Sequence, residues 1–169
     1  MKNLLLTLGM ACVVLAETAT LPSAQDKDEA RGQTIKYQVH RGYFESNKSG
    51  LKGDVSFLAF TEEKAFDKIF GKAFVLGKKP NFLPRNAFES NIAFATIKRG
   101  GTIWTYKVDK VTADEGTVYV QYEASAKDGG GARFASPLIV SVDKGKYSKV
   151  VFIENGKRAG TADIEKQAN

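Results

Sequence analysis

The chain has 169 residues, with 25 basic and 19 acidic residues and a formal net charge of +6, and this length is enough for one domain with a single core. One histidine and one cysteine exclude a metal site built from several histidines and any disulfide within the chain. The basic residues stand in runs of no more than two, which favours a solvated basic surface, with weak binding to polyanions or anionic lipid head groups as the alternative.

The N-terminal segment has the pattern of an export signal. Lys2 precedes an apolar run over residues 4–16, which is too short to span a membrane because spanning takes about 20 apolar residues. We therefore expect a signal peptide within residues 1–24, cut between 16 and 24, and a periplasmic or secreted protein without a transmembrane span. Cys12 would leave with this peptide, so the mature domain would be free of cysteine. A lipoprotein anchored at Cys12 is disfavoured, because Gly9 stands where such signals carry a leucine.

Residues 20–33 are polar and mixed in charge, which predicts a flexible leader that ends at residue 33. From Ile35 apolar and polar residues alternate, and this period of two predicts a half-buried strand with His40 on its polar face. A second, apolar strand is expected over residues 55–60. The sequence Thr61-Glu62-Glu63 then predicts a helix start with a hydroxyl cap, and the helix over 62–70 would bury a stripe of three residues, Phe66, Ile69 and Phe70.

The pattern of the second half predicts strands joined by turns. Residues 72–90 are expected to form an irregular connection, followed by a central strand over 92–97. That strand, 104–108 and 118–122 would form an antiparallel meander of three. A glycine loop over 127–133 would precede a final hairpin of strands 138–142 and 149–154, and residues 157–169 would form a frayed polar tail.

These elements predict an α+β, mainly-β fold. We expect an antiparallel sheet of about seven strands, built from a meander and hairpins, with one short helix packed on it. The single globular domain would span residues 34–156.

Three stretches resemble the C-terminal domain family of the protease-complex subunit PrcB. They are Val55–Phe70, a strand running into a helix with aromatic residues; Ile92–Val111, a strand, a glycine turn and a strand; and Val118–Val142, in which Ser136-Pro137 opens the last hairpin. The family's glycine turn usually ends in Gly-Gly-Tyr, whereas here Thr102-Ile103-Trp104 follows Gly101. The resemblance implies an exported, non-catalytic accessory or binding domain, and the altered turn puts in question any function tied to that turn.

The sequence carries no assembled catalytic motif. His40 is expected at the surface or in a hydrogen bond, and the alternative is a catalytic base for a serine, although no Gly-x-Ser-x-Gly elbow is present. The paired carboxylates Glu62/Glu63 and Asp114/Glu115 are explained by a helix start and a turn. We therefore expect no enzyme, no cofactor, no metal site and no binding of nucleic acid.

Aromatic residues are the remaining signal, with eleven phenylalanines, six tyrosines and one tryptophan. Most are expected in the core, and a ligand groove is the alternative for Trp104 and Tyr106. Together with three cations that flank glycine turns, these two give a candidate binding set: Lys98, Arg99, Trp104, Tyr106 and Arg133.

The leading functional prediction is an exported accessory domain of the cell envelope or secretome that binds a protein or another envelope component. A small-ligand or lipid carrier and a small hydrolase that uses His40 are the alternatives. The carrier would require an apolar pocket of a few hundred Å³ inside the sheet, and the hydrolase would require His40 in a cleft beside a serine or carboxylate.

Overall fold

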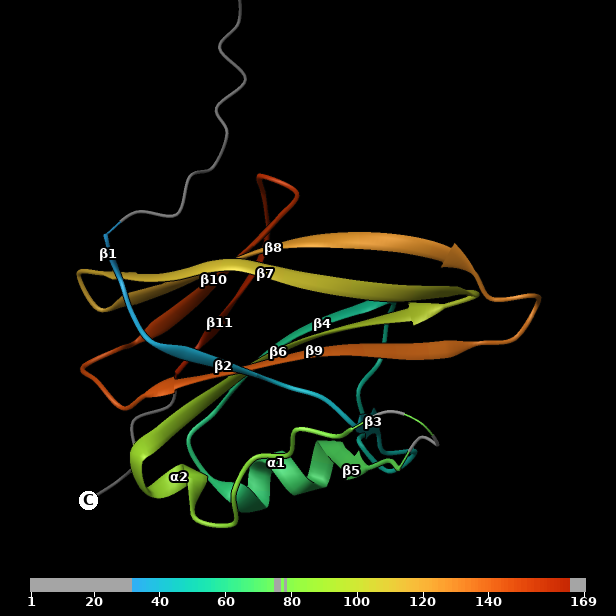
Figure 1. The fold of residues 1–169 in the computed structure, drawn as a ribbon, viewed down its shortest axis with the longest axis horizontal. Helices are drawn as coiled ribbons and strands as arrows, with labels where there is room; N and C mark the ends of the chain where they lie inside the picture. Colours follow the sequence, from blue (N-terminus) through green and yellow to red (C-terminus); the bar gives the residue numbers. More distant parts are fainter. Residues whose placement is uncertain (1–31, 75–76, 78, 165–169) are drawn as a thin grey trace, which may run out of the picture.

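A computed structural model describes residues 32–74, 77 and 79–164. The expected signal peptide and its cleavage site lie outside the described residues. The described chain forms two packed sheets, a two-stranded ribbon and two short helices (Figure 1). The α+β, mainly-β class is therefore confirmed.

The larger sheet has five strands in the order β1-β7-β8-β10-β11. Their bounds are β1 Gln33–Thr34, β7 Thr102–Asp114, β8 Thr117–Asp128, β10 Lys149–Glu154 and β11 Lys157–Asp163. Neighbours are antiparallel except β8 and β10, which run parallel.

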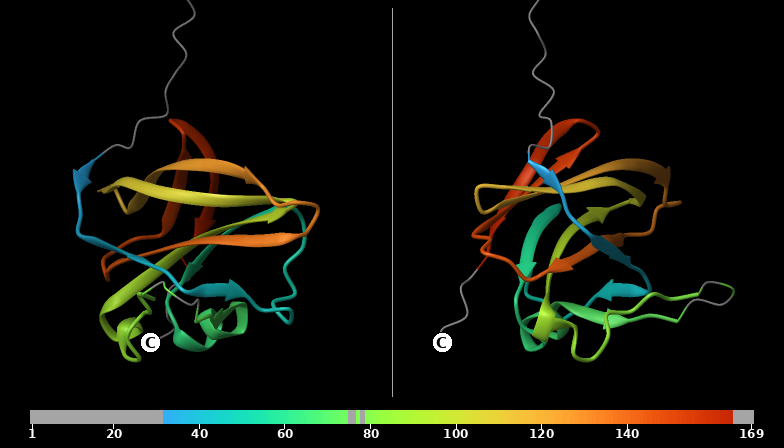
Figure 2. Two further views of the ribbon diagram at one scale, coloured as in Figure 1. Left: turned by 45° about the vertical axis from the view of Figure 1, so that its right-hand side comes forward. Right: turned by 60° about the vertical axis from the view of Figure 1, so that its left-hand side comes forward.

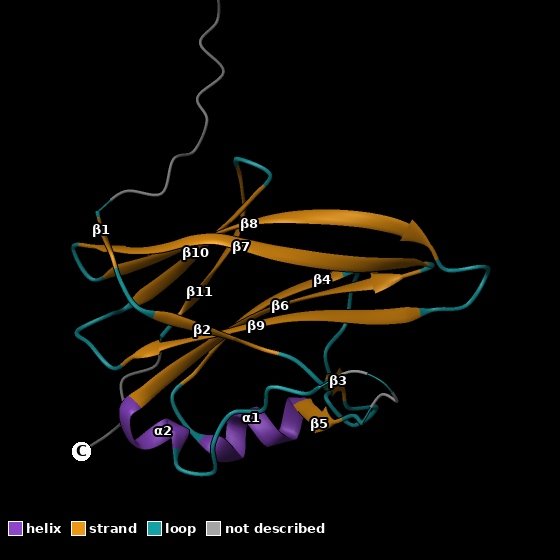
Figure 3. Cartoon of the chain, in the orientation of Figure 1, coloured by secondary structure: helices purple, strands orange, loops and turns teal. Residues whose placement is uncertain are grey.

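The second sheet has four antiparallel strands in the order β2-β9-β6-β4. Their bounds are β2 Tyr37–His40, β9 Phe134–Asp143, β6 Asn91–Gly100 and β4 Val55–Phe60. The remaining elements lie against the outer face of this sheet (Figures 2 and 3): β3 Tyr43–Glu45 paired with β5 Phe70–Lys72, α1 Glu63–Ile69 and α2 Ala87–Ser90.

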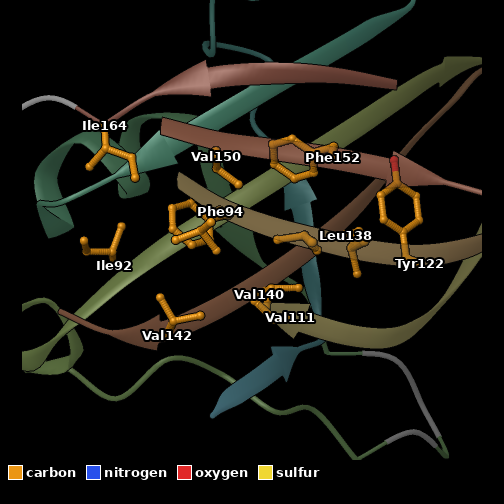
Figure 4. Packing of buried hydrophobic residues seen from close by; sticks show 12 residues of the cluster. Ile92, Phe94, Val111, Tyr122, Leu138, Val140, Val142, Val150, Phe152 and Ile164 are labelled. Carbon is orange, nitrogen blue, oxygen red and sulfur yellow. The ribbon is translucent and has the colours of Figure 1, made fainter. Parts of the chain in front are cut away.

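The main core lies between the two sheets. Alternate residues of β6 and β9 point inward and meet inward residues of β8 and β10, as the period of two in a strand requires (Figure 4). Four of these side chains, Phe94, Val120, Tyr122 and Phe152, are at most 1 % exposed.

A second core lies between the four-stranded sheet and α1. Phe66 is 2 % exposed and contacts the rings of Phe60, Phe70 and Phe88 at centroid separations of 4.9 to 5.6 Å. The expected apolar stripe of the helix is therefore buried against the sheet. The helix start differs from the expected one, because the N-cap is Glu62 and makes no side-chain capping hydrogen bond.

Three local expectations about strand pairing and the tail were wrong. Strand β6 pairs with β9 and β4, whereas β7 pairs with β8, so the turn at Gly100 leads from one sheet to the other and no three-stranded meander forms. Strand β10 leaves β9 and pairs with β8, so the final hairpin is absent from the described chain. Residues 157–163, expected to fray, form β11 because their backbone completes the ladder of β10.

The chain is also ordered somewhat earlier than expected. Gln33, placed at the end of the flexible leader, pairs with Ala113 in β7. The expected central position of residues 92–97 is confirmed, because β6 has neighbours on both sides and its side chains are buried on both faces.

Candidate functional site

Three of the five candidate residues meet at the end of β6 and the start of β7. The turn at Gly100 and Gly101 brings the two strands together, and Lys98 Nζ lies 3.7 Å from the ring centroid of Trp104. This separation is within the range of a cation–π interaction. Tyr106 follows Trp104 on the same side of β7, so the period of two predicted in the sequence does place these side chains together.

The charge of Lys98 is compensated inside the protein. Its ammonium forms an ion pair with Glu154, and the two side chains are 13 % and 17 % exposed. The Tyr122 hydroxyl donates a hydrogen bond of 3.0 Å to the other Glu154 oxygen. Lys98 therefore balances a largely buried carboxylate, and an acidic ligand would have to compete with that carboxylate for it.

The two tyrosines of this cluster stay protonated. Burial first, and then the nearby charge of Glu154, raise the pKa values of Tyr106 and Tyr122. The Tyr106 hydroxyl donates to the backbone oxygen of Ser136 at 2.9 Å. These hydroxyls therefore act as hydrogen-bond donors that position neighbouring strands.

Arg99 and Arg133 lie apart from this cluster. Arg99 forms a two-pronged contact with Glu45, with nitrogen–oxygen distances of 2.6 and 2.9 Å, and also donates to Ser56 Oγ at 3.0 Å. This arrangement ties β3 to β6 and β4. Arg133 is exposed in the loop after β8.

Trp104 and Tyr106 also form one wall of a groove, here named the edge groove, of about 550 Å³. Its other walls come from the middle of β9 and from the chain that runs from β2 to β3. The lining residues are Val39–Tyr43, Ala73, Trp104–Tyr106 and Pro137–Ile139. The sequence pointed to the β7 wall only, because the other walls are brought there by sheet pairing that no local pattern encodes.

The groove exists because β2 separates from β9 after His40. Arg41, the next residue, exchanges two backbone hydrogen bonds with Asn81, of 3.0 and 3.1 Å. Gly42 then turns the chain with a φ of +89°, and a Cβ atom there would lie 2.9 Å from both Phe82 and Pro80. The turn therefore requires glycine for its conformation and for its space.

One exposed aromatic side chain, Phe74, lies beside the groove. Phe74 follows the groove residue Ala73, is 80 % exposed, and packs edge-on against Phe82 with 5.3 Å between centroids. Lys72 Nζ lies 5.5 Å from the Phe82 ring. Phe44 of β3 is 47 % exposed.

The sequence predicted His40 on an open polar face of its strand, but His40 is buried. It is 4 % exposed, and Asn81 lies against this part of β2, where its side-chain amide donates to the Val39 oxygen and its backbone pairs with Arg41. Its Nε2 lies 2.8 Å from Ser141 Oγ, and Ser141 is 2 % exposed. Burial lowers the pKa of His40, an effect that the nearby Asn81 backbone partly opposes.

Comparisons with known proteins leave the site to be interpreted from its geometry. No protein-family model, no curated protein and no solved structure matches the chain. Within the described residues, no three histidine, cysteine or carboxylate side chains gather as a metal site. The described helices are all too short or too polar to cross a bilayer.

Proposed function

We propose that the chain is an exported, non-enzymatic binding domain that contacts a protein partner in the cell envelope or secretome. The observation that carries the proposal is Phe74, a large aromatic side chain that is 80 % exposed and packs on Phe82 beside the edge groove. Exposed apolar patches mark interaction sites, and aromatic residues are enriched where proteins meet. The same role is implied by the resemblance to the PrcB family.

The carrier alternative is less well supported. Aromatic rings fill the space between α1 and the sheet, where Phe66 contacts three phenylalanines. The space between the sheets is filled by side chains such as Phe94 and Tyr122. The edge groove borders both cores through Leu138 and Ile139, and its lining includes the exposed Arg41.

The hydrolase alternative rests on the 2.8 Å contact between His40 and Ser141. This is the spacing that a serine nucleophile and its base require. However, Ser141 lies within β9 between β2 and β6, and a substrate would have to reach a side chain that is 2 % exposed. A structural hydrogen bond explains the pair better.

The test is site-directed photo-crosslinking of the full chain in cells that produce it. A benzophenone side chain replaces Phe74, and the matched control replaces Lys146, which is exposed in the loop between β9 and β10 (Figure 1). We expect a discrete crosslinked protein from position 74 and none from position 146.

Two outcomes would overturn the proposal. One is the absence of any crosslinked protein at position 74. The other is hydrolysis of esters, peptides or glycosides by the purified chain that is abolished in both His40→Ala and Ser141→Ala, which would establish the hydrolase instead.

A further inference from the structure

Two segments that are far apart in the sequence meet at the turn after β2. The chain leaves β5 at Ala73, whose N–H donates to the Gly42 oxygen at 2.6 Å, and it returns at Asn81, which exchanges two backbone hydrogen bonds with Arg41. Pro80 also lies against this turn, because a Cβ atom on Gly42 would come within 2.9 Å of its side chain. The turn at residues 41–42 therefore holds both ends of the segment 73–81.

Exposed cations surround a pair of phenylalanines at this turn. Phe74 is 80 % exposed and packs edge-on against Phe82, and Lys72 Nζ lies 5.5 Å from the centre of the same Phe82 ring. Arg41 lies in the turn itself, and Lys79 stands next to the proline that contacts the turn; both are exposed, as is Lys72. We name these five residues the cationic aromatic patch: Arg41, Lys72, Phe74, Lys79 and Phe82.

The positive charge of the patch is left unpaired. Within the described residues, none of its three cations forms an ion pair, whereas Lys98, Arg99 and Lys107 each have a carboxylate partner. The two segments that build the patch lie in residues 33–44 and 68–88, and neither range contains an acidic residue, while the second carries five basic ones. An acidic ligand would therefore reach these cations without displacing a partner within the described chain.

The two kinds of side chain in the patch define the chemistry of its ligand. Cations attract carboxylates, and complementary charge across an interface favours the matching partner. The Phe74 ring is removed from water only if the ligand also offers an apolar or aromatic group, and aromatic residues are enriched where proteins meet. Arg41 and Ala73 also line the edge groove, so the surface around the patch is hollowed, which suits a folded partner better than a flat bilayer.

We propose that the cationic aromatic patch binds an acidic surface of the partner protein, in which carboxylates flank an apolar or aromatic side chain. This inference rests on the proposed function, because it states the chemistry of the partner that Phe74 contacts. Arg41, Lys72 and Lys79 pair with the carboxylates, and the Phe74 ring, supported by Phe82, packs against the apolar group.

The probe is a random copolymer of glutamate and tyrosine, compared with polyglutamate of the same length in titrations of the full chain. We expect the copolymer to bind about tenfold more tightly although it carries fewer carboxylates, because it also offers aromatic rings. Phe74→Ala should remove this preference.

Charge reversal at two positions tests the cations. The double variant Lys72→Glu with Lys79→Glu should bind the copolymer about tenfold more weakly than the natural chain, because it places like charges against the carboxylates. The matched control, Lys146→Glu with Lys149→Glu, makes the same change in net charge at exposed lysines outside the patch, and it should lose less than about threefold.

Three outcomes of these titrations would overturn the inference. Equal losses in the two double variants would show that charge acts from the whole surface and not from the patch. Equal affinity of the natural chain for the two polymers would show that the aromatic pair is not used. Vesicles of phosphatidylglycerol that bind more tightly than the copolymer, and lose this binding in the variant of Lys72 and Lys79, would assign the patch to a lipid surface.

A crosslinking experiment separates this inference from the proposed function. Each pair of substitutions is placed in the chain that carries benzophenone at position 74. We expect the pair at Lys72 and Lys79 to abolish the crosslinked protein and the pair at Lys146 and Lys149 to preserve it. A crosslinked protein that persists with the first pair would overturn the acidic partner surface and leave the proposed binding function standing.

Discussion

The His40 ring is buried beside Ser141, and burial lowers its pKa below the ordinary 6.5. Below pH 6.5 the unfolded chain binds a proton that the folded ring resists, so the free energy of unfolding falls as pH falls, by up to about 1.4 kcal/mol per pH unit. The full contribution is present above pH 6.5. Urea unfolding at pH 7.5 and pH 5.5 should show a larger loss for the natural chain than for His40→Gln.

The His40→Gln variant is a suitable reference because glutamine keeps a polar group near Ser141 and does not titrate. All carboxylates are common to both chains, so their protonation cancels in the difference. Equal losses of stability in the two chains would show that His40 is as easily protonated when folded as when unfolded.

The sequence predicted which side chains of β7 lie together, but not which cations of the site are paired with carboxylates. Alternation placed Trp104 and Tyr106 on one side of β7, and the structure has them together in the groove wall. The same reading offered Lys98 and Arg99 as free cations, whereas each has a carboxylate partner more than fifty residues away. A sequence shows a charge but not its partner, because such partners are set by tertiary packing.

The helix α1 should lose its packing on the sheet when Phe66 is truncated. Phe66 is 2 % exposed and contacts four aromatic rings, those of Tyr43, Phe60, Phe70 and Phe88. Phe66→Ala would leave a cavity between helix and sheet, and we expect a loss of about 3 to 5 kcal/mol in the free energy of unfolding. Phe74→Ala, which removes a ring that is 80 % exposed, is the control and should cost less than about 0.5 kcal/mol. Equal melting temperatures of Phe66→Ala and the natural chain would contradict the assignment of Phe66 to the core.

Strands and the main helix were predictable from local pattern, but their partners were not. Periods of two over β2, β7 and β8 and an apolar stripe on α1 depend on neighbouring residues alone. Adjacent strands in sequence usually pair, and that rule failed at the turn from β6 to β7 and at the loop from β9 to β10. At both places the chain crosses from one sheet to the other. The pairing partner of the next strand therefore depends on how the apolar faces of the two sheets pack together.

The polar strand β11 could not be predicted from local pattern either. Its residues carry too few apolar side chains to be recognised as a strand, and it forms because β10 offers an unpaired edge. In the described part of the chain, β7 also keeps an open edge over residues 102–110 and β9 over residues 134–138, because β1 pairs only with residues 112–113 and β2 only with residues 139–142.

The net charge of the whole molecule, +6, favours electrostatic binding of polyanions. Lys98 and Arg99 are engaged with Glu154 and Glu45, so the exposed cations, Arg133 among them, carry any such contact. Binding through exposed charges is screened by salt, with a Debye length of about 10 Å at 0.1 M and about 3 Å at 1 M. Affinity for polyglutamate, measured by titration, should therefore fall steeply between these two salt concentrations.

Two matched variants locate this binding. At 0.1 M salt, Arg133→Gln should weaken polyglutamate binding more than Lys98→Gln, because the charge of Lys98 is already compensated by Glu154 while that of Arg133 faces solvent. Circular dichroism of both variants confirms that each is folded before the titrations are compared. Two outcomes would contradict binding to a dispersed basic surface: affinity that survives 1 M salt, or a larger loss of affinity in Lys98→Gln than in Arg133→Gln. Either would mean that the polyanion enters a specific site beside Trp104 and displaces Glu154 from Lys98.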